Sequence, residues 1–291
     1  MQNADVAPDT RFGAHMQTVG GLHNAFREGA KVGCDVIQIF TKSPQQWRAR
    51  PLEDAQIEAF LNASRETGIR CLASHDTYLI NPASGDPELL QKSRDALVDE
   101  MERSSALGIP YVVMHLGAAG KEPEADALQR LCDSVAYVLE RAPENGATLL
   151  LETTAGQGTC LGHRFDHLEQ ILKFTGDHPG LGVCFDTCHV FVAGYDLRDE
   201  AGYSATMAEF DERVGLSRVR VVHANDAKKE LGSRVDRHDH IGQGQIGSEA
   251  FRLLLTDPRL AHAAIVLETP KEGGMDPTNL AALRTAAGIS T

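Results

Sequence analysis

The sequence of 291 residues predicts a (β/α)8 barrel, or TIM barrel, that forms a single domain over residues 1–291. Two observations predict this fold: short apolar runs recur eight times, and each is followed by turn residues and a segment with helical spacing. Continuous apolar runs are typical of parallel strands covered on both faces, and eight such units suit a barrel of about 250 residues. An open doubly wound sheet is the alternative, because strand order is not visible in a sequence.

The strands are expected at residues 11–15, 35–40, 71–74, 111–115, 148–152, 182–186, 218–223 and 265–268. Two of the helices between them have clear ends. One follows Pro51 and ends at Gly68, and another covers residues 89–107 and is closed by Gly108. Glycine directly after a helix is a typical stop signal. No glycine-rich dinucleotide or phosphate loop follows any strand.

The composition is that of a soluble globular protein, with 42% hydrophobic and 24% charged residues. The polar residues 1–10 lack the pattern of a signal peptide, and no apolar run reaches the roughly 18 residues of a membrane span. We therefore expect a cytoplasmic protein with no membrane partner. The six cysteines form no CxxC pair and are expected to be buried free thiols. Cys188 lies between two candidate ligands, but alternation would turn it away from them.

The net charge of −13 taken alone argues against a nucleic-acid partner, because phosphate binding needs local positive potential. Bound divalent ions would change that balance within one pocket. One segment, residues 221–247, also carries four basic residues: Lys228, Lys229, Arg234 and Arg237. The sequence therefore allows a basic patch on an acidic protein.

Potential metal ligands follow six consecutive strands. In barrels of this kind, functional side chains lie where the strands end and the next loops begin. These positions hold, in chain order, His75, His115, Glu152, Asp186, His223 and Glu268. A single strand-end carboxylate is usually a helix cap, and a single histidine is usually structural. Six successive strands that end in this way predict a shared site at one rim.

The segment 221–247 adds to this rim. Connections longer than about 12–15 residues inside a compact domain are usually functional or disordered. Asp236, His238 and His240 occupy every second position, so an extended backbone would turn them to one side. Spacing alone does not choose between His238 and His240. His189, three residues after Asp186, completes the candidate set.

The other histidines are expected to stay outside this set. Exposed or helix-capping positions are expected for His163, His167, His178, His262 and His23, and His15 would support the ligands from behind. Nitrogen and oxygen ligands with several carboxylates suggest more than one divalent ion of the zinc or manganese kind. A carboxylate that bridges two cations about 3.5–4 Å apart is typical of two-metal hydrolysis.

At these residues the sequence resembles the endonuclease IV family of apurinic/apyrimidinic (AP) endonucleases, over essentially the whole chain. The motifs that carry the resemblance are FTKSPQQW (40–47), HDTYLINPA (75–83), LETTAGQG (151–158), FDTCHVFVAGYD (185–196), HANDAKKELGSRVDRHDHIGQGQIG (223–247) and LETP (267–270). The resemblance implies a metal-dependent hydrolase of base excision repair that needs no obligate protein partner.

Residue by residue, the resemblance implies three divalent ions, most simply zinc, with manganese as an alternative at one or more sites. The first ion would be held by His75 and His115, and Glu152 would bridge it to the second. The second would also bind Asp186, His223 and Glu268. The third would be held by His189, Asp236 and His238, which leaves His240 behind the ligands or beside a phosphate. A hydroxide bridging the first two ions would attack the phosphate 5′ to an abasic site, leaving a 3′-hydroxyl and a 5′-deoxyribose phosphate.

The substrate implied by the resemblance is duplex DNA that contains an abasic site, which swings out of the duplex at little cost. In this family, side chains after strands two and three enter the minor groove, where apolar wedges hold DNA bent. Tyr78 and Leu79 match the second of these loops. In the loop after strand two, some members of the family carry arginine where this chain has Gln45, and Arg48 lies close by in the sequence.

Phosphate contacts would come from the segment 221–247 through Lys228, Arg234 and Arg237. The alternative function is a metal-dependent sugar isomerase or epimerase of the same barrel class. Such an enzyme would need neither the third-ion ligands nor the loop at Tyr78.

Overall fold

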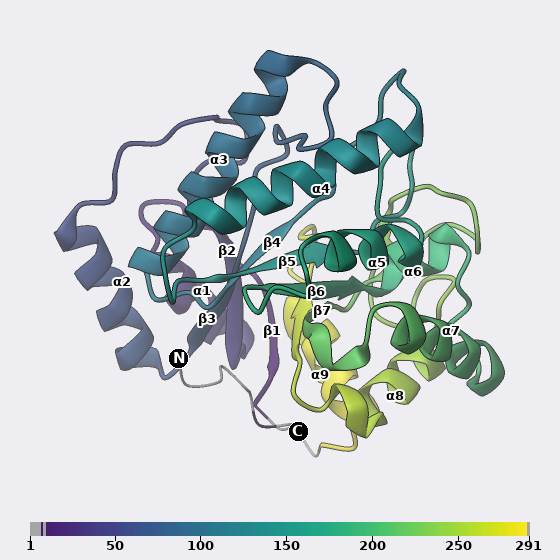
Figure 1. The fold of residues 1–291 in the computed structure, drawn as a ribbon. Coiled ribbons are helices and arrows are strands. Elements are labelled where there is room, and N and C mark those ends of the chain that lie inside the picture. Colours follow the sequence, from purple (N-terminus) through teal and green to yellow (C-terminus); the bar gives the residue numbers. More distant parts are fainter. Residues whose placement is uncertain (1–6, 8–9, 290–291) are drawn as a thin grey trace.

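The computed structural model describes residue 7 and residues 10–289, and it shows a closed barrel of eight parallel strands surrounded by helices (Figure 1). The barrel strands follow one another in chain order, and the last pairs with the first: β1 (Phe12–His15), β2 (Val36–Phe40), β3 (Arg70–His75), β4 (Tyr111–Met114), β5 (Thr148–Glu152), β6 (Leu181–Asp186), β7 (Val219–His223) and β10 (Ala264–Leu267). The predicted (β/α)8 barrel is therefore confirmed, and the open sheet is not found.

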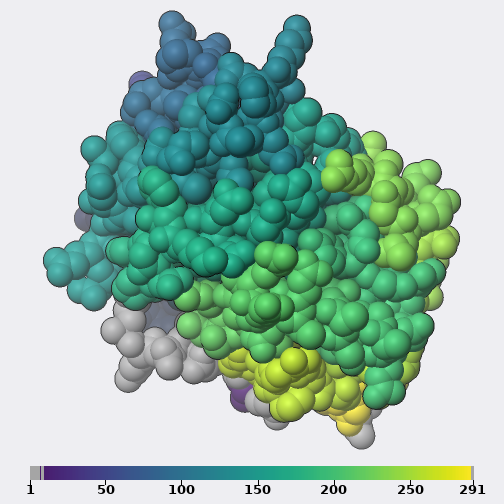
Figure 2. Space-filling view, turned by 45° about the vertical axis from the view of Figure 1, so that its right-hand side comes forward, coloured from purple at the N-terminus to yellow at the C-terminus, as the bar shows by residue number. Residues whose placement is uncertain are grey.

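The helices lie outside the barrel wall, and Figure 2 shows the middle third of the chain, in teal and green, closing over one side of the molecule. They are α1 (Asn24–Val32), α2 (Asp54–Thr67), α3 (Pro87–Ala106), α4 (Glu124–Arg141), α5 (Phe165–Phe174), α6 (Thr187–Ala193), α7 (Glu200–Arg213), α8 (Ser248–Thr256) and α9 (Asp276–Ala286), with short 3-10 helices η1 (Leu216–Arg218) and η2 (Pro258–Leu260) before β7 and β10. No helix in the described part of the chain has the length and apolarity to cross a bilayer.

Local sequence signals explain where the helices begin and end. The carboxylate of Asp86 accepts hydrogen bonds from the backbone N–H groups of Glu88 and Leu89, which starts α3 at Pro87. Helix α2 ends at Gly68, whose φ of 73° suits glycine in the left-handed region. Both predicted helices are confirmed, with ends shifted by a few residues. The N-terminal residues 1–6 and 8–9, which carry most of the stretch judged to lack a signal peptide, lie outside the described residues.

Apolar side chains fill the barrel interior below the carboxyl ends of the strands. Side chains from the strands form a buried apolar cluster that includes Val36, Leu72, Val113, Leu150 and Val266. A larger cluster fills the space between the strands and the helices. Polar side chains gather above the interior cluster, at the carboxyl ends of the strands, which is where functional residues of this fold lie.

The segment 221–247 folds back on itself instead of running extended. After β7 ends at His223, the two-residue strand β8 (Asp226–Ala227) pairs antiparallel with β9 (His238–Asp239). The buried carboxylate of Asp226 accepts hydrogen bonds from the backbone N–H groups of Gly244, Ile246 and Gly247. These hydrogen bonds order residues 244–247, and the β8–β9 pairing places His238 opposite Ala227.

Candidate metal centre

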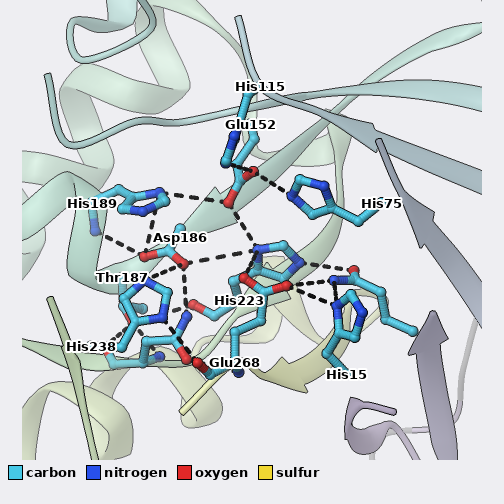
Figure 3. A network of polar contacts seen from close by, with 12 residues as sticks. His15, His75, His115, Glu152, Asp186, Thr187, His189, His223, His238 and Glu268 are labelled. Atoms are coloured by element: carbon cyan, nitrogen blue, oxygen red, sulfur yellow. Dashed lines mark hydrogen bonds and ion pairs between the residues drawn. The ribbon is translucent and has the colours of Figure 1, made fainter. Parts of the chain in front are cut away.

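The nine residues predicted as metal ligands meet at the mouth of the barrel. They form three groups within which the potential ligand atoms all lie within 4.8 Å of one another: His75, His115 and Glu152; Glu152, Asp186, His223 and Glu268; and His189, Asp236 and His238. Figure 3 shows the labelled members of these groups pointing toward one another. The grouping is the one that the resemblance implied, and each group contains nitrogen and oxygen donors that suit zinc.

Glu152 joins the first two groups. It is the last residue of β5, and its side chain is completely buried. Its Oε2 lies 3.1 Å from Nε2 of both His75 and His115, whereas its Oε1 lies 2.9 Å from Nδ1 of His223. The two oxygens of one carboxylate therefore face different groups, which is the arrangement that a bridging ligand requires.

The third group depends on α6 and on the β8–β9 hairpin. Asp186 caps α6 by accepting a hydrogen bond from the backbone N–H of His189, and this places the imidazole of His189 over the barrel mouth. Asp236 Oδ2 lies 3.1 Å from Nε2 of His189, and Asp236 Oδ1 lies 3.3 Å from Nε2 of His238. Those two Nε2 atoms are buried and make no hydrogen bond. Buried nitrogen atoms without a partner, beside a carboxylate, fit a bound cation.

The histidine rings are oriented by hydrogen bonds on their far sides. Nδ1 of His75 lies 2.9 Å from the carbonyl oxygen of the next residue, Nδ1 of His189 lies 2.9 Å from that of Thr153, and Nδ1 of His238 lies 3.0 Å from that of Glu268. A carbonyl only accepts, so each Nδ1 carries the proton. When such a ring is neutral, its lone pair is therefore on Nε2, the atom that faces the group. Such outer contacts are typical of histidines that bind metals.

The electrostatics of the site favour cations. Burial opposes ionisation of Glu152, but the imidazoles of His115 and His223 outweigh it and lower the pKa of this carboxyl well below its usual value. In the same way, His189 lowers the pKa of Asp236 to about 2 against the effect of burial. The carboxylates of Glu152 and Asp236 therefore stay ionised at neutral pH. Metal ions entering the site would compete with protons on the histidines.

Two polar residues that sequence reasoning missed support this arrangement. The amide nitrogen of Asn225 donates to Asp186 Oδ2 at 2.7 Å, and its oxygen accepts from the backbone N–H of Glu268 at 2.8 Å. Thr153 Oγ1 accepts from the backbone N–H of Asp186 at 2.9 Å. Asn225 is fully buried two residues after a strand-end histidine, and that position is the signal that could have found it.

Three expectations about side-chain environment are corrected. His163 and His167 were expected to be exposed or to cap helices, but both are buried, and their rings meet edge to face at 5.1 Å. Nδ1 of His167 accepts from the backbone N–H of Gly162, so this ring satisfies the backbone under the loop after β5. Cys188 does not turn away, because its Sγ belongs to a group with Asp186 and His238. Burial raises the pKa of this thiol, which disfavours the thiolate that binds metals.

His15 contacts Glu268 of the second group, with Nδ1 3.2 Å from Oε1, whereas the other remaining histidines lie apart from the three groups. His178 is exposed, His23 precedes α1, and Nε2 of the half-buried His262 lies 2.8 Å from the carbonyl oxygen of Val219. His240 lies two residues after His238, but its Nδ1 lies 3.1 Å from the side-chain amide of Asn279. The structure therefore brings His238, and not His240, into the third group.

Three of the residues predicted to contact DNA, Tyr78, Leu79 and Arg237, line a cavity beside this centre. Tyr78, in the turn after β3, is 67% exposed, and its ring meets that of Phe40 at 5.6 Å. A cavity of about 380 Å³ lies beside the groups and is lined in part by Tyr78, Leu79, His189 and Arg237. The other predicted contacts are exposed on the loops after β2 and β7: Gln45, Arg48, Lys228 and Arg234.

Comparison with known proteins places the chain in a family. Residues 26–288 match the family described as a xylose isomerase-like TIM barrel. The chain is 49% identical over 282 residues to the probable endonuclease 4 of Chloroflexus aggregans, which covers 96% of this chain and 99% of that protein. It is 45% identical to the probable endonuclease 4 of Geotalea daltonii over 274 residues, 94% of this chain and 96% of that protein.

Solved structures agree with these relatives. The crystal structure of endonuclease IV from Thermus thermophilus has a TM-score of 0.83 and 36% sequence identity, over 96% of this chain and 99% of that one. A D-tagatose 3-epimerase-like protein matches with a TM-score of 0.74 but 18% identity, over 96% of this chain and 97% of that one, and shares the fold alone. The predicted resemblance is confirmed, and the chain belongs to the endonuclease IV family.

Proposed function

We propose that this protein cleaves duplex DNA on the 5′ side of abasic sites, leaving a 3′-hydroxyl and a 5′-deoxyribose phosphate. Three divalent ions, most simply zinc, would be its cofactors. The observation that carries the proposal is the third group, His189, Asp236 and His238, which closes beside the two groups that share Glu152. A centre of this size suits a phosphodiester, which must be stabilised at both its attacking and its leaving oxygen.

The residues of each group fit the ions they would hold. His75 and His115 would bind the first, and Glu152 would bridge it to a second that is also held by Asp186, His223 and Glu268. The third would rest on His189, Asp236 and His238. When bound, such ions supply positive charge to the phosphoryl group and activate water near neutral pH.

The protein's own part is to hold these donors in place before substrate arrives. Five of the ligands are nearly or wholly enclosed, with Glu152, Asp186 and His223 completely buried and His75 and His189 almost so. Because their partners are fixed by hydrogen bonds, little reorganisation is needed when charge develops on the phosphate. The fixed carboxylates also attract divalent cations to this pocket of an acidic protein.

Substrate selection would come from the loops around the centre. The cavity beside the groups, about 380 Å³, lies near the lower end of the range for small-ligand pockets, about 300–1,000 Å³. It suits a sugar phosphate that has lost its base. Tyr78 and Leu79 would fill the gap left in the duplex, and Arg48, Lys228, Arg234 and Arg237 would contact phosphates, with Gln45 beside them.

The whole chain, residues 1–291, would form one AP endonuclease domain. The six cysteines are free thiols, which suits a reducing compartment such as the cytoplasm. A sugar isomerase or epimerase of the same barrel class is the second candidate, because the first two groups would also suit an enzyme that binds one or two divalent ions. The third group distinguishes the two candidates, since sugar isomerisation does not require it.

The test uses the zinc-loaded protein and a duplex oligonucleotide with one abasic site. We expect a single cut whose 3′ end a DNA polymerase extends directly, and no cut in a matched duplex with a normal base. A tetrahydrofuran analogue, which cannot undergo β-elimination, should be cut as well. An intact abasic strand together with epimerisation of a ketohexose would overturn the proposal in favour of the second candidate.

A further inference from the structure

Gln38 is a buried polar residue in the middle of an apolar strand, and it touches the proposed metal ligands from inside the barrel. It lies in β2, has no exposed surface, and pairs in register with His15 of β1. Its side chain reaches two ligands of the second group. The amide nitrogen lies 2.7 Å from Glu268 Oε1, and the amide oxygen lies 2.9 Å from His223 Nε2.

The orientation of this amide follows from its partners. Oε1 of Glu268 accepts a hydrogen bond from this amide at 2.7 Å, and an amide group donates only through its nitrogen. The amide nitrogen of Gln38 must therefore face Glu268, and the amide oxygen must face His223. An oxygen at that place accepts a hydrogen bond, so Nε2 of His223 carries the proton.

The position of this proton determines which nitrogen of His223 can bind a metal ion. With the proton on Nε2, the lone pair lies on Nδ1, the atom that is 2.9 Å from Glu152 and 3.3 Å from Glu268 Oε2. His223 thus presents Nδ1 to its group, whereas His75, His189 and His238 present Nε2. A backbone carbonyl orients the ring in those three histidines, whereas the side chain of Gln38 orients the ring of His223.

His15 holds Gln38 from the neighbouring strand. Its Nδ1 lies 3.0 Å from the amide nitrogen of Gln38 and 3.2 Å from Glu268 Oε1. The amide is therefore fixed on three sides, by His15, Glu268 and His223. Because the side chain has no exposed surface, these contacts do not compete with bulk water.

We propose that Gln38 is a positioning residue of the metal centre, which selects the Nδ1 face of His223 and aims Glu268 at the second ion. This inference rests on the proposed function, because it assigns Gln38 to one of the three proposed ion sites. Removal of partners that orient metal ligands typically lowers metal affinity by about 10–100-fold. We expect a loss in this range for the second site only.

The test is the variant Gln38→Met, which keeps a similar volume but offers neither donor nor acceptor. Val36→Ala is the matched control, because Val36 points into the same barrel from the same strand, in the apolar cluster below. Zinc affinity is measured in both variants and in the wild type by competition with a chromophoric chelator. Thermal unfolding of the metal-free proteins shows whether each variant is folded.

We expect Gln38→Met to lose affinity for one of three zinc ions by about 10–100-fold, while Val36→Ala keeps all three affinities despite a lower unfolding temperature. Nitrogen-15 spectra of the zinc-loaded wild type should show His223 bound through Nδ1 and protonated at Nε2. Unchanged zinc affinity in a folded Gln38→Met protein, or His223 bound through Nε2, would overturn the inference. A wild type that binds no zinc would instead reject the proposed function.

Discussion

Replacement of His238 by alanine tests the third ion site directly. Nε2 of His238 lies 3.3 Å from Asp236 Oδ1 and 3.8 Å from Asp186 Oδ2, and its Nδ1 bonds to the carbonyl oxygen of Glu268. The side chain is partly exposed, with 16% of its surface accessible, so its loss leaves no closed apolar cavity. We therefore expect the fold to survive and the effect to fall on metal binding.

The magnitude follows from the number of ligands. Zinc sites with four protein ligands bind with about 10–16 kcal/mol, which is roughly 3 kcal/mol for each ligand. Loss of one ligand from this group should then weaken the third ion by about 100-fold. At limiting zinc, cleavage of an abasic duplex should fall by a similar factor, and added zinc should restore most of it.

His240→Ala is the matched control, because it removes the same kind of side chain two residues away. His240 contacts Asn279 and belongs to none of the three groups. Zinc content after dialysis against a chelator, together with the cleavage rate, should separate the variants. Retention of three zinc ions by His238→Ala, or loss of one by His240→Ala, would contradict the assignment.

Three further predictions concern DNA binding and stability. Tyr78→Ala should weaken binding to an abasic duplex by about 10-fold, as expected for loss of an aromatic contact with bases, without changing zinc content; unaltered affinity in a filter-binding assay would make Tyr78 merely structural. Lys42→Met should reduce the free energy of unfolding by about 3–5 kcal/mol in urea titrations, because it leaves the buried Glu100 without its cationic partner at 3.2 Å. An equal stability in Lys42→Met and the wild type would refute this. Burial lowers the pKa of His167 from 6.5 to about 4, so the unfolded chain takes up this proton first and stability should decline as the pH falls from 6.5 to 4. His167→Asn should keep the hydrogen bond from the backbone N–H of Gly162 and should reduce this pH-dependent loss of unfolding free energy by no more than about 3 kcal/mol. An unchanged pH dependence would show that His167 does not cause it.

Much of the fold and of the centre could be predicted because both depend on periodic positions. Strand ends in a barrel converge on one rim, so the burial of Glu152, Asp186 and His223 follows from where their apolar runs stop. Their convergence required no knowledge of individual contacts. The family motifs then separated His238 from His240, which spacing could not do.

Other features depend on contacts between distant segments and were not predictable in this way. The burial of His163 and His167 results from packing of the loop after β5 against α5, and a local pattern does not report it. The antiparallel pairing of β8 with β9 and the hydrogen bonds of Asp226 to backbone groups about twenty residues later both join segments that are apart in the chain. Gln38 interrupts an apolar strand, and that single polar residue was the signal for its role.

The most direct test of the central claim is the rate of incision as a function of zinc bound per chain. Metal-free protein would be titrated with zinc, and bound zinc and cutting of an abasic duplex would be measured in the same samples. We expect incision to be absent without zinc and to reach its full rate only as the third equivalent binds. Full activity in the metal-free protein, or after a single equivalent, would contradict a centre built from all three groups.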